Sequence, residues 1–189
     1  MSTKHSKAAE TFLKNRSLAA WHDETLWMVR AKRDKMSKAV PEWEHLRDMA
    51  CAIKMYSNSH LDQLLVEFEK NAKANGAHVY WAKDAEEYCS IVARILEEHQ
   101  VKHFIKSKSM LAEECGLNEY LEQKGVEVVE SDLGERILQL MHKKPSHIVL
   151  PAIHVKKEEI GELFVKEMGT EPGNNDQTYL THAARKNLR

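Results

Sequence analysis

Two lysines and two serines alternate in the stretch Lys106-Ser107-Lys108-Ser109, which follows a short apolar run and precedes a segment of helical character. A strand that leads through such a loop into a helix can hold an anion, because the first N–H groups of a helix lack intrahelical partners. The hydroxyl and ammonium groups would add donors there. A plainer interpretation stays open, in which one serine caps the helix and the lysines are solvated. The stretch lacks the glycines of a P-loop.

Asp132, Glu135 and His154 are further candidates for a binding site. Asp132 and Glu135 could act as a general base or as metal ligands, or they could form the capping box of a helix. His154 could transfer a proton near neutral pH, and a hydrogen-bonded loop histidine is the open alternative. Glu130, at the end of an apolar run, is ambiguous. The sequence alone leaves the catalytic residue unknown.

The sequence predicts no metal site. Its three cysteines, Cys51, Cys89 and Cys115, are far apart, and none belongs to a C-x-x-C pair. The eleven histidines are scattered along the chain. We therefore expect the cysteines to be small packed hydrophobic residues.

Charge and hydropathy exclude several classes of protein. The 28 basic and 29 acidic side chains leave no net field that would recruit nucleic acid or an anionic membrane surface. No apolar run approaches the roughly 20 residues that cross a bilayer, and the amino-terminal residues lack the apolar core of a signal peptide. We expect a soluble cytoplasmic protein that neither inserts into membranes nor binds nucleic acid.

The composition changes near residue 76. All seven glycines lie at or after Gly76, and Pro41 is the only proline before it. Residues 1–76 are therefore predicted to form a helical arm, and residues 77–189 an α/β domain. Three of the four tryptophans lie in the arm, where they could anchor it to the domain or bind a partner protein.

After Gly76 the pattern predicts strands at 77–82, 103–106, 126–130 and 147–150, separated by helical segments. Such alternation is typical of a parallel sheet with helices on both faces. Ligands of these sheets bind beyond the carboxyl ends of the strands. The loops that should converge on a site are therefore 82–84, 107–110, 131–135 and 152–154.

Six motifs in order resemble a known family. They are Leu26-Trp27-x-x-Arg30-x-x-Arg33-Asp34, Pro41-Glu42-Trp43-Glu44-x-Leu46-Arg47, Lys106-Ser107-Lys108-Ser109-Met110-x-x-Glu113-Glu114, Glu127-Val128-Val129-Glu130-Ser131-Asp132-Leu133-Gly134-Glu135, Pro145-Ser146-His147-Ile148-Val149-x-Pro151-Ala152-x-His154 and Leu180-Thr181-x-x-Ala184-Arg185. Together they resemble the amino-terminal half of the LutB-like (YkgF-type) lactate-utilisation iron–sulfur proteins, which carry a LUD domain.

This resemblance implies a NagB/RpiA/CoA-transferase-like fold and an oxidoreductase component that helps to oxidise L-lactate to pyruvate. It also implies other lactate-utilisation subunits as partners. In full-length relatives, [4Fe–4S] clusters in a carboxyl-terminal ferredoxin-like segment transport the electrons.

The chain departs from that pattern at its end. It stops at Arg189, before the rest of the LUD domain and before the cluster cysteines of its relatives. We therefore expect a truncated product that binds no cluster itself and is either not catalytic alone or completed by the missing carboxyl-terminal half. The alternative is a stand-alone module that binds an anion of the phosphosugar or CoA type and has no redox activity.

Overall fold

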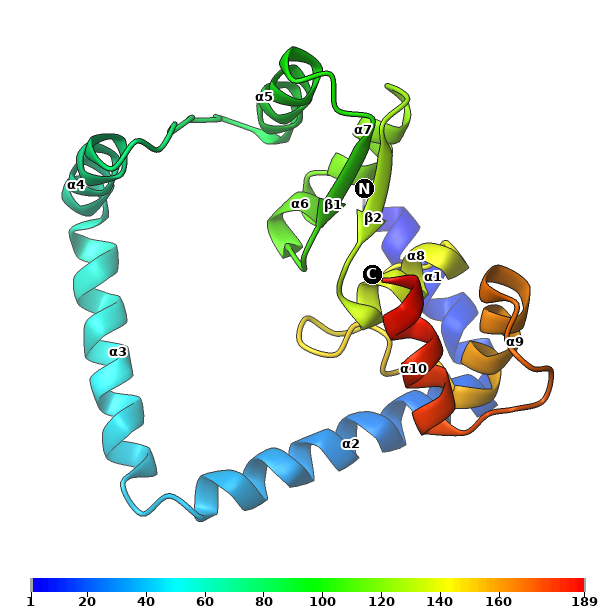
Figure 1. Ribbon diagram of the computed structural model, residues 1–189. Coiled ribbons are helices and arrows are strands. Elements are labelled where there is room, and N and C mark those ends of the chain that lie inside the picture. Colours follow the sequence, from blue (N-terminus) through cyan, green and yellow to red (C-terminus); the bar gives the residue numbers. More distant parts are fainter. Residues whose placement is uncertain (1, 189) are drawn as a thin grey trace. The chain divides into compact units, whose positions relative to one another are not determined.

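A computed structural model describes the backbone of residues 2–188 and the side chains of residues 5–188 (Figure 1). The chain divides into two compact units. Unit 1 comprises Met1–Thr25 and Lys83–Arg189, and unit 2 comprises Leu26–Ala82. Helix α1 (Ser2–Lys14) belongs to unit 1, and α2 (Arg16–Lys38) begins in unit 1 and ends in unit 2.

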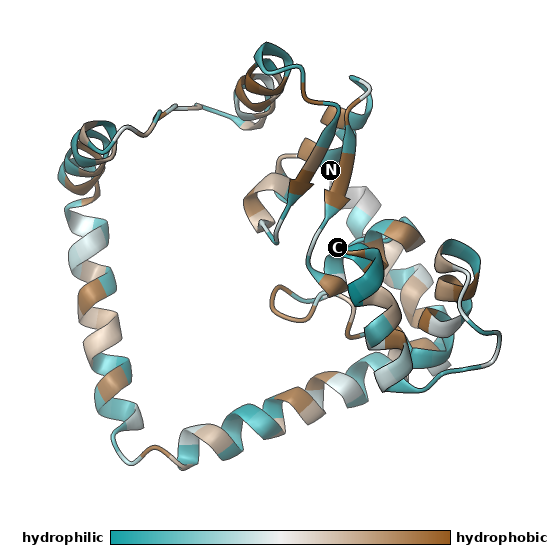
Figure 2. Ribbon diagram, in the orientation of Figure 1, coloured by the Kyte–Doolittle hydropathy of each residue, from teal (hydrophilic) through white to brown (hydrophobic). Residues whose placement is uncertain are grey.

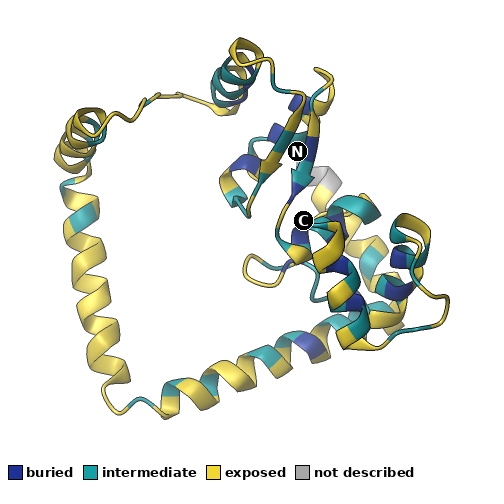
Figure 3. Cartoon of the chain, viewed as in Figure 1, coloured by how far each residue is buried: buried dark blue, intermediate teal, exposed yellow. Residues whose placement is uncertain are grey.

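Unit 2 is helical, which confirms the predicted amino-terminal helical arm. After α2 it contains α3 (Trp43–Ser59) and α4 (Leu61–Ala74), and neither of these two helices contains a buried residue. Figure 3 shows both helices almost entirely exposed. Ile53 and Phe68, for example, are each 62% exposed. The apolar residues of α3 and α4 are thus not part of a packed core within the described residues.

The first half of unit 1 contains the sheet. Its elements are α5 (Ala85–Glu98), β1 (His103–Lys106), α6 (Met110–Glu114), α7 (Leu117–Glu122) and β2 (Glu127–Glu130). The strands pair in parallel, with Phe104 opposite Val128 and Lys106 opposite Glu130. Asp84 caps α5 by accepting a hydrogen bond from Glu87 N at 2.9 Å. The α/β class and the parallel pairing are therefore as predicted.

A hydrophobic core lies between helices α5, α6 and α7 and one face of this sheet. It consists of Cys89, Ala93, Ala112, Leu117, Leu121 and Val128, with Phe104 packed against it. Because side chains alternate along a strand, Phe104, Lys106, Val128 and Glu130 share this covered face. Ile105 belongs to the other face and is 68% exposed. Both strands are hydrophobic in the middle (Figure 2), but charged residues end them on the covered face.

Two of the four predicted strands are wrong. Residues 77–82 and 147–150 have no regular strand structure. In the second segment, His147 Nδ1 accepts hydrogen bonds from the backbone N–H groups of Val149 and Leu150, both at 3.1 Å. Such a local side-chain bond competes with strand pairing. For 77–82 the pattern of side chains is that of a strand, but a strand also requires a neighbour to pair with, and the described sheet contains only β1 and β2.

The second half of unit 1 is a helical cluster of α8 (Leu133–Met141), α9 (Lys157–Met168) and α10 (Gln177–Asn187). Its core consists of Ile137, Phe164, Leu180 and Ala184. Gly161 of α9 allows a close approach, because a Cβ at this position would lie 2.0 Å from Asn175 Oδ1. None of the helices in the described chain is long and apolar enough to span a bilayer.

Leu121 tests the first core. It is fully buried, whereas Leu111 on α6 is 60% exposed. Leu121→Ala should lower the free energy of unfolding by about 2–5 kcal/mol because it leaves a cavity, and Leu111→Ala should change it by less than about 1 kcal/mol. Urea denaturation followed by the amide NMR signals of α7 measures both. Equal losses would contradict this core.

Candidate functional site

The two strands end side by side and leave the sheet together. Lys106 and Glu130, the last residues of β1 and β2, are partners in the register. The backbone N–H and the hydroxyl of Ser131 both donate to Lys106 O, at 2.9 and 3.0 Å. The loops that follow the two strands therefore start at the same place.

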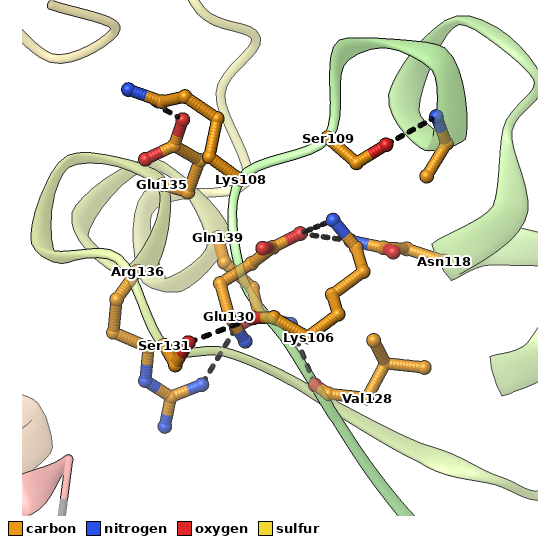
Figure 4. A network of polar contacts seen from close by, with 11 residues as sticks. Lys106, Lys108, Ser109, Asn118, Val128, Glu130, Ser131, Glu135, Arg136 and Gln139 are labelled. Atoms are coloured by element: carbon orange, nitrogen blue, oxygen red, sulfur yellow. Dashed lines mark hydrogen bonds and ion pairs between the residues drawn. The ribbon is translucent and has the colours of Figure 1, made fainter. Parts of the chain in front are cut away.

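A buried ion pair joins the ends of the strands. Lys106 Nζ lies 2.5 Å from Glu130 Oε1, and the two side chains are only 9% and 6% exposed. Asn118 of α7 donates from Nδ2 to the same Oε1 at 2.8 Å (Figure 4). The charges lie here because both residues point to the covered face of the sheet. Removing one partner would leave a buried charge without compensation, which is costly.

Gln139 attaches α8 to β2. Its Nε2 donates to Val128 O at 2.7 Å, and its Oε1 accepts from Glu130 N at 3.2 Å. Arg136 donates to that Oε1 at 2.7 Å. Sequence reasoning did not find Asn118 or Gln139, and it left Glu130 without a role. Strand alternation beside Lys106 is the signal that could have found Glu130.

A second ion pair connects three loops. Lys108 Nζ lies 3.2 Å from Glu135 Oε1 and donates to Val149 O, also at 3.2 Å. Pro151 packs against Gly134, where an added Cβ would lie 2.8 Å from the proline ring. The loops 107–110 and 131–135 therefore meet, as predicted, and the chain just before 152–154 reaches them.

Asp132 and Glu135 form a coupled pair of carboxyl groups. Asp132 caps α8 by accepting from Gly134 N at 3.0 Å, which is the Asp132 part of the predicted capping box, whereas the Glu135 carboxyl group pairs with Lys108. The pKa of Glu135 is raised to about 7, first by burial and then by its hydrogen bond with Asp132. The same hydrogen bond lowers the pKa of Asp132. Near neutral pH the pair holds one exchangeable proton, which suits a general acid or base.

Ser107, Ser109 and His154, the remaining candidates, lie as follows. Ser109 Oγ accepts from Ala112 N at 3.2 Å and so caps α6, as the plainer interpretation expects. Ser107 is exposed. His154 is hydrogen-bonded to Ser146 Oγ at 2.8 Å, and its ring centroid lies 6.4 Å from that of His22.

His154 and the loop 82–84 have partners of their own, apart from the ion pairs. Burial is the main cause that lowers the pKa of His154. In the loop 82–84, Asp84 caps α5 and Lys83 N donates to Glu87 Oε2 at 2.9 Å. The structure thus pairs Lys106 with Glu130 and Lys108 with Glu135, in two separate ion pairs at the ends of the strands.

The expectation of packed cysteines holds for two of the three. Cys89 is buried and its Sγ donates to Cys115 O at 3.4 Å, and Cys115 packs against the same core. Cys51, on α3, is exposed. Among the residues that the structure describes, no group of three or more His, Cys, Asp or Glu side chains is placed to hold a metal ion.

Lys106→Met tests the buried pair. The methionine is about as long as the lysine but carries no charge, so Glu130 stays buried without a counter-ion. The free energy of unfolding should therefore fall by about 3–5 kcal/mol. The double variant Lys106→Met/Glu130→Leu should recover most of that loss. Urea denaturation followed by NMR signals of unit 1 measures both, with Lys102→Met, at an exposed position, as the matched control. A double variant no more stable than the single one would refute the pair's role.

Glu135 should make stability depend on pH. Its folded pKa of about 7 exceeds its ordinary value of 4.5, so the native state binds more protons than the unfolded state between these values. The free energy of unfolding should therefore fall as pH rises from 4.5 to 7. Glu135→Gln removes this dependence.

We expect the free energy of unfolding of Glu135→Gln minus that of the parent protein to increase from pH 4.5 to pH 7 and to stay constant above pH 7. The lowered pKa of His154 makes the free energy of unfolding rise with pH. This contribution is present in both the variant and the parent protein, so it cancels in the difference. Denaturation midpoints across the interval supply the measurement. A difference that does not vary with pH would contradict the raised pKa.

Comparison with known proteins identifies the family. The sequence model of the LUD domain matches residues 65–189. Lactate utilization protein B of Exiguobacterium sp. is 43% identical over 148 residues, which are 78% of this chain and 31% of the relative. The proteins of that name from Bacillus pumilus and Macrococcus caseolyticus are 41% and 38% identical over 74% and 84% of this chain, and 30% and 33% of their own lengths.

The chain thus spans about a third of the length of these curated relatives. No solved structure matches it. The matched residues include β1, β2 and both ion pairs described above. The chain belongs to the LUD domain family.

Proposed function

We propose that this chain acts in lactate utilisation, as the amino-terminal portion of a protein like lactate utilization protein B. The observation that carries this proposal is the identity of 38–43% to proteins of that name over 74–84% of the chain. This similarity extends from the LUD domain match, which starts at residue 65, into the helical arm, because it covers up to 159 residues.

The finer form of the proposal is a component of a cytoplasmic complex that oxidises L-lactate to pyruvate. Its partners are other lactate-utilisation subunits and the polypeptide that carries the remaining part of the relatives' length. Electron transport through iron–sulfur clusters would take place in the remaining part of the relatives' length, as the resemblance of the motifs implies.

Within such a complex, unit 1 would contribute the edge of the sheet at which β1 and β2 end. The proton shared by Asp132 and Glu135 gives this edge a group that can accept or release a proton near neutral pH. The buried Lys106–Glu130 pair holds the strand ends in register. Lys108 connects the loop after β1 to the carboxyl group of Glu135.

A stand-alone anion-binding module receives less support from this geometry. Both candidate lysines are engaged by carboxylates, Lys106 by Glu130 and Lys108 by Glu135. A phosphate group would have to displace one of these carboxylates from its lysine.

A chimeric protein tests the proposal. In a Bacillus strain that depends on its own lactate utilization protein B for growth on L-lactate, the matched third of that protein is replaced by the corresponding residues of this chain. Growth on L-lactate should be retained, because the replacement supplies the same portion of the fold. Growth curves on L-lactate and on pyruvate measure the effect.

Two variants of the chimera serve as controls. Lys106→Met should abolish growth on L-lactate, whereas the exposed Lys102→Met should retain it. Immunoblots establish the amount of each chimera. A chimera that accumulates to the level of the parent and supports growth on pyruvate but not on L-lactate would overturn the proposal.

A further inference from the structure

Helix α8 closes the outer edge of β2, the long side of the strand that faces away from β1. In a parallel pair, successive residues turn their N–H and C=O groups alternately toward the neighbouring strand and away from it. Val128 O and Glu130 N belong to the outer edge, and both bond to the carboxamide of Gln139, at 2.7 and 3.2 Å. This side-chain amide has a donor and an acceptor, so it makes the two hydrogen bonds that a further strand would make with β2.

The outer edge of β1 has no such partner. Lys106 O accepts from Ser131 N at 2.9 Å, and Phe104 lies two residues earlier, so these two residues turn their backbone groups to β2. The N–H and C=O groups of His103 and Ile105 therefore point away from β2. Within the described residues the sheet has no third strand that could pair with them. They form an open strand edge, which natural proteins usually cover or protect.

Apolar side chains are exposed close to this open edge. Ile105, on the uncovered face of the sheet, is 68% exposed. The loop 147–150 carries Ile148 and Val149, which are exposed as well (Figure 3). Lys108, two residues after β1, holds this loop by donating to Val149 O at 3.2 Å. The open edge and the apolar loop thus belong to one region of unit 1.

The length of the relatives supplies an occupant for this region. All-parallel sheets are normally covered on both faces, and two strands alone are marginally stable. The chain spans only 30–33% of the length of the curated relatives, so the greater part of each relative lies outside the matched residues. Because that part belongs to the same polypeptide in the relatives, it meets the matched part at a high effective concentration.

We propose that an extended segment from the remaining part of the relatives' length adds to the outer edge of β1 as a third strand. Its backbone groups bond to the N–H and C=O groups of His103 and Ile105, the mode by which peptides bind at sheet edges. Its side chains on the uncovered face are apolar, because they cover Ile105 and the loop 147–150. This inference rests on the proposed function, since it states where the proposed partner polypeptide binds.

Hydrogen exchange tests the edge in the isolated chain and in the chimera described above. In the isolated chain, the N–H of Ile105 should exchange faster than those of Phe104 and Lys106, which face β2. In the chimera, the Ile105 N–H should exchange at least about tenfold more slowly, because a hydrogen bond to the added strand protects it. Mass spectrometry with single-residue fragmentation measures both proteins. If the chimera does not accumulate, the unmodified lactate utilization protein B of the same strain replaces it, at the residue aligned with Ile105.

A variant of the edge and a matched control locate the contact. Ile105→Lys opposes strand addition, because a lysine on an edge strand hinders pairing with another strand. Val66→Lys is the control, since this β-branched residue of α4 is 69% exposed. After correction for intrinsic rates, Ile105→Lys should return the exchange at position 105 of the chimera to the rate of the isolated chain. Val66→Lys should leave the slow rate unchanged, and equal rates in the two variants would overturn the inference.

The outcomes separate this inference from the proposed function. A chimera that supports growth on L-lactate, while its Ile105 N–H exchanges as fast as in the isolated chain, overturns the inference alone. A chimera that protects this N–H without supporting growth overturns the proposed function alone. An isolated chain that runs as a dimer on size-exclusion chromatography, with this N–H already protected, would assign the edge to a second copy and overturn the inference.

Discussion

The parallel register of β1 and β2 is the constraint on which the rest of unit 1 depends. It brings Lys106 and Glu130 together at the end of the same covered face. The residues before them on this face, Phe104 and Val128, are apolar and belong to the core or pack against it. A shift of either strand by one residue would turn its charged residue to the exposed face and its apolar residue out of the core. Burial of the core and pairing of the charges therefore select the same register.

This register also determines the chemistry of the loops. Because the strands end together, the loop that carries Lys108 meets the loop that carries Glu135. Gln139 then attaches α8 to the backbone of β2, and this fixes the carboxyl pair of Asp132 and Glu135 beside the sheet. A stretch of lysines and serines that seems cationic in the sequence has, in the folded chain, each of its two lysines paired with a glutamate. The neighbours of a charged residue, more than its own sign, decide what it can bind.

Local features of the structure could be predicted from the sequence, and features that depend on distant partners could not. Ser109 and Asp132 cap helices because a hydroxyl or carboxylate just before a helix satisfies its first N–H groups, and this information lies within four residues. Residues 77–82 and 147–150 have the composition of strands, but composition cannot show whether a neighbouring strand is present. Asn118 and Gln139 reach Glu130 from 12 and 9 residues away. Their role appears only once the chain is folded.

The absence of buried residues from α3 and α4 has a consequence for how the chain melts. A helix without a packed face is held mainly by its own propensity and by pairs such as Glu69–Lys73, at 2.6 Å on successive turns. Such exposed pairs contribute little to stability, because water and salt screen them. Helices α3 and α4 should therefore open in local fluctuations that leave the cores of unit 1 intact. A single transition temperature would average two processes and describe neither of them.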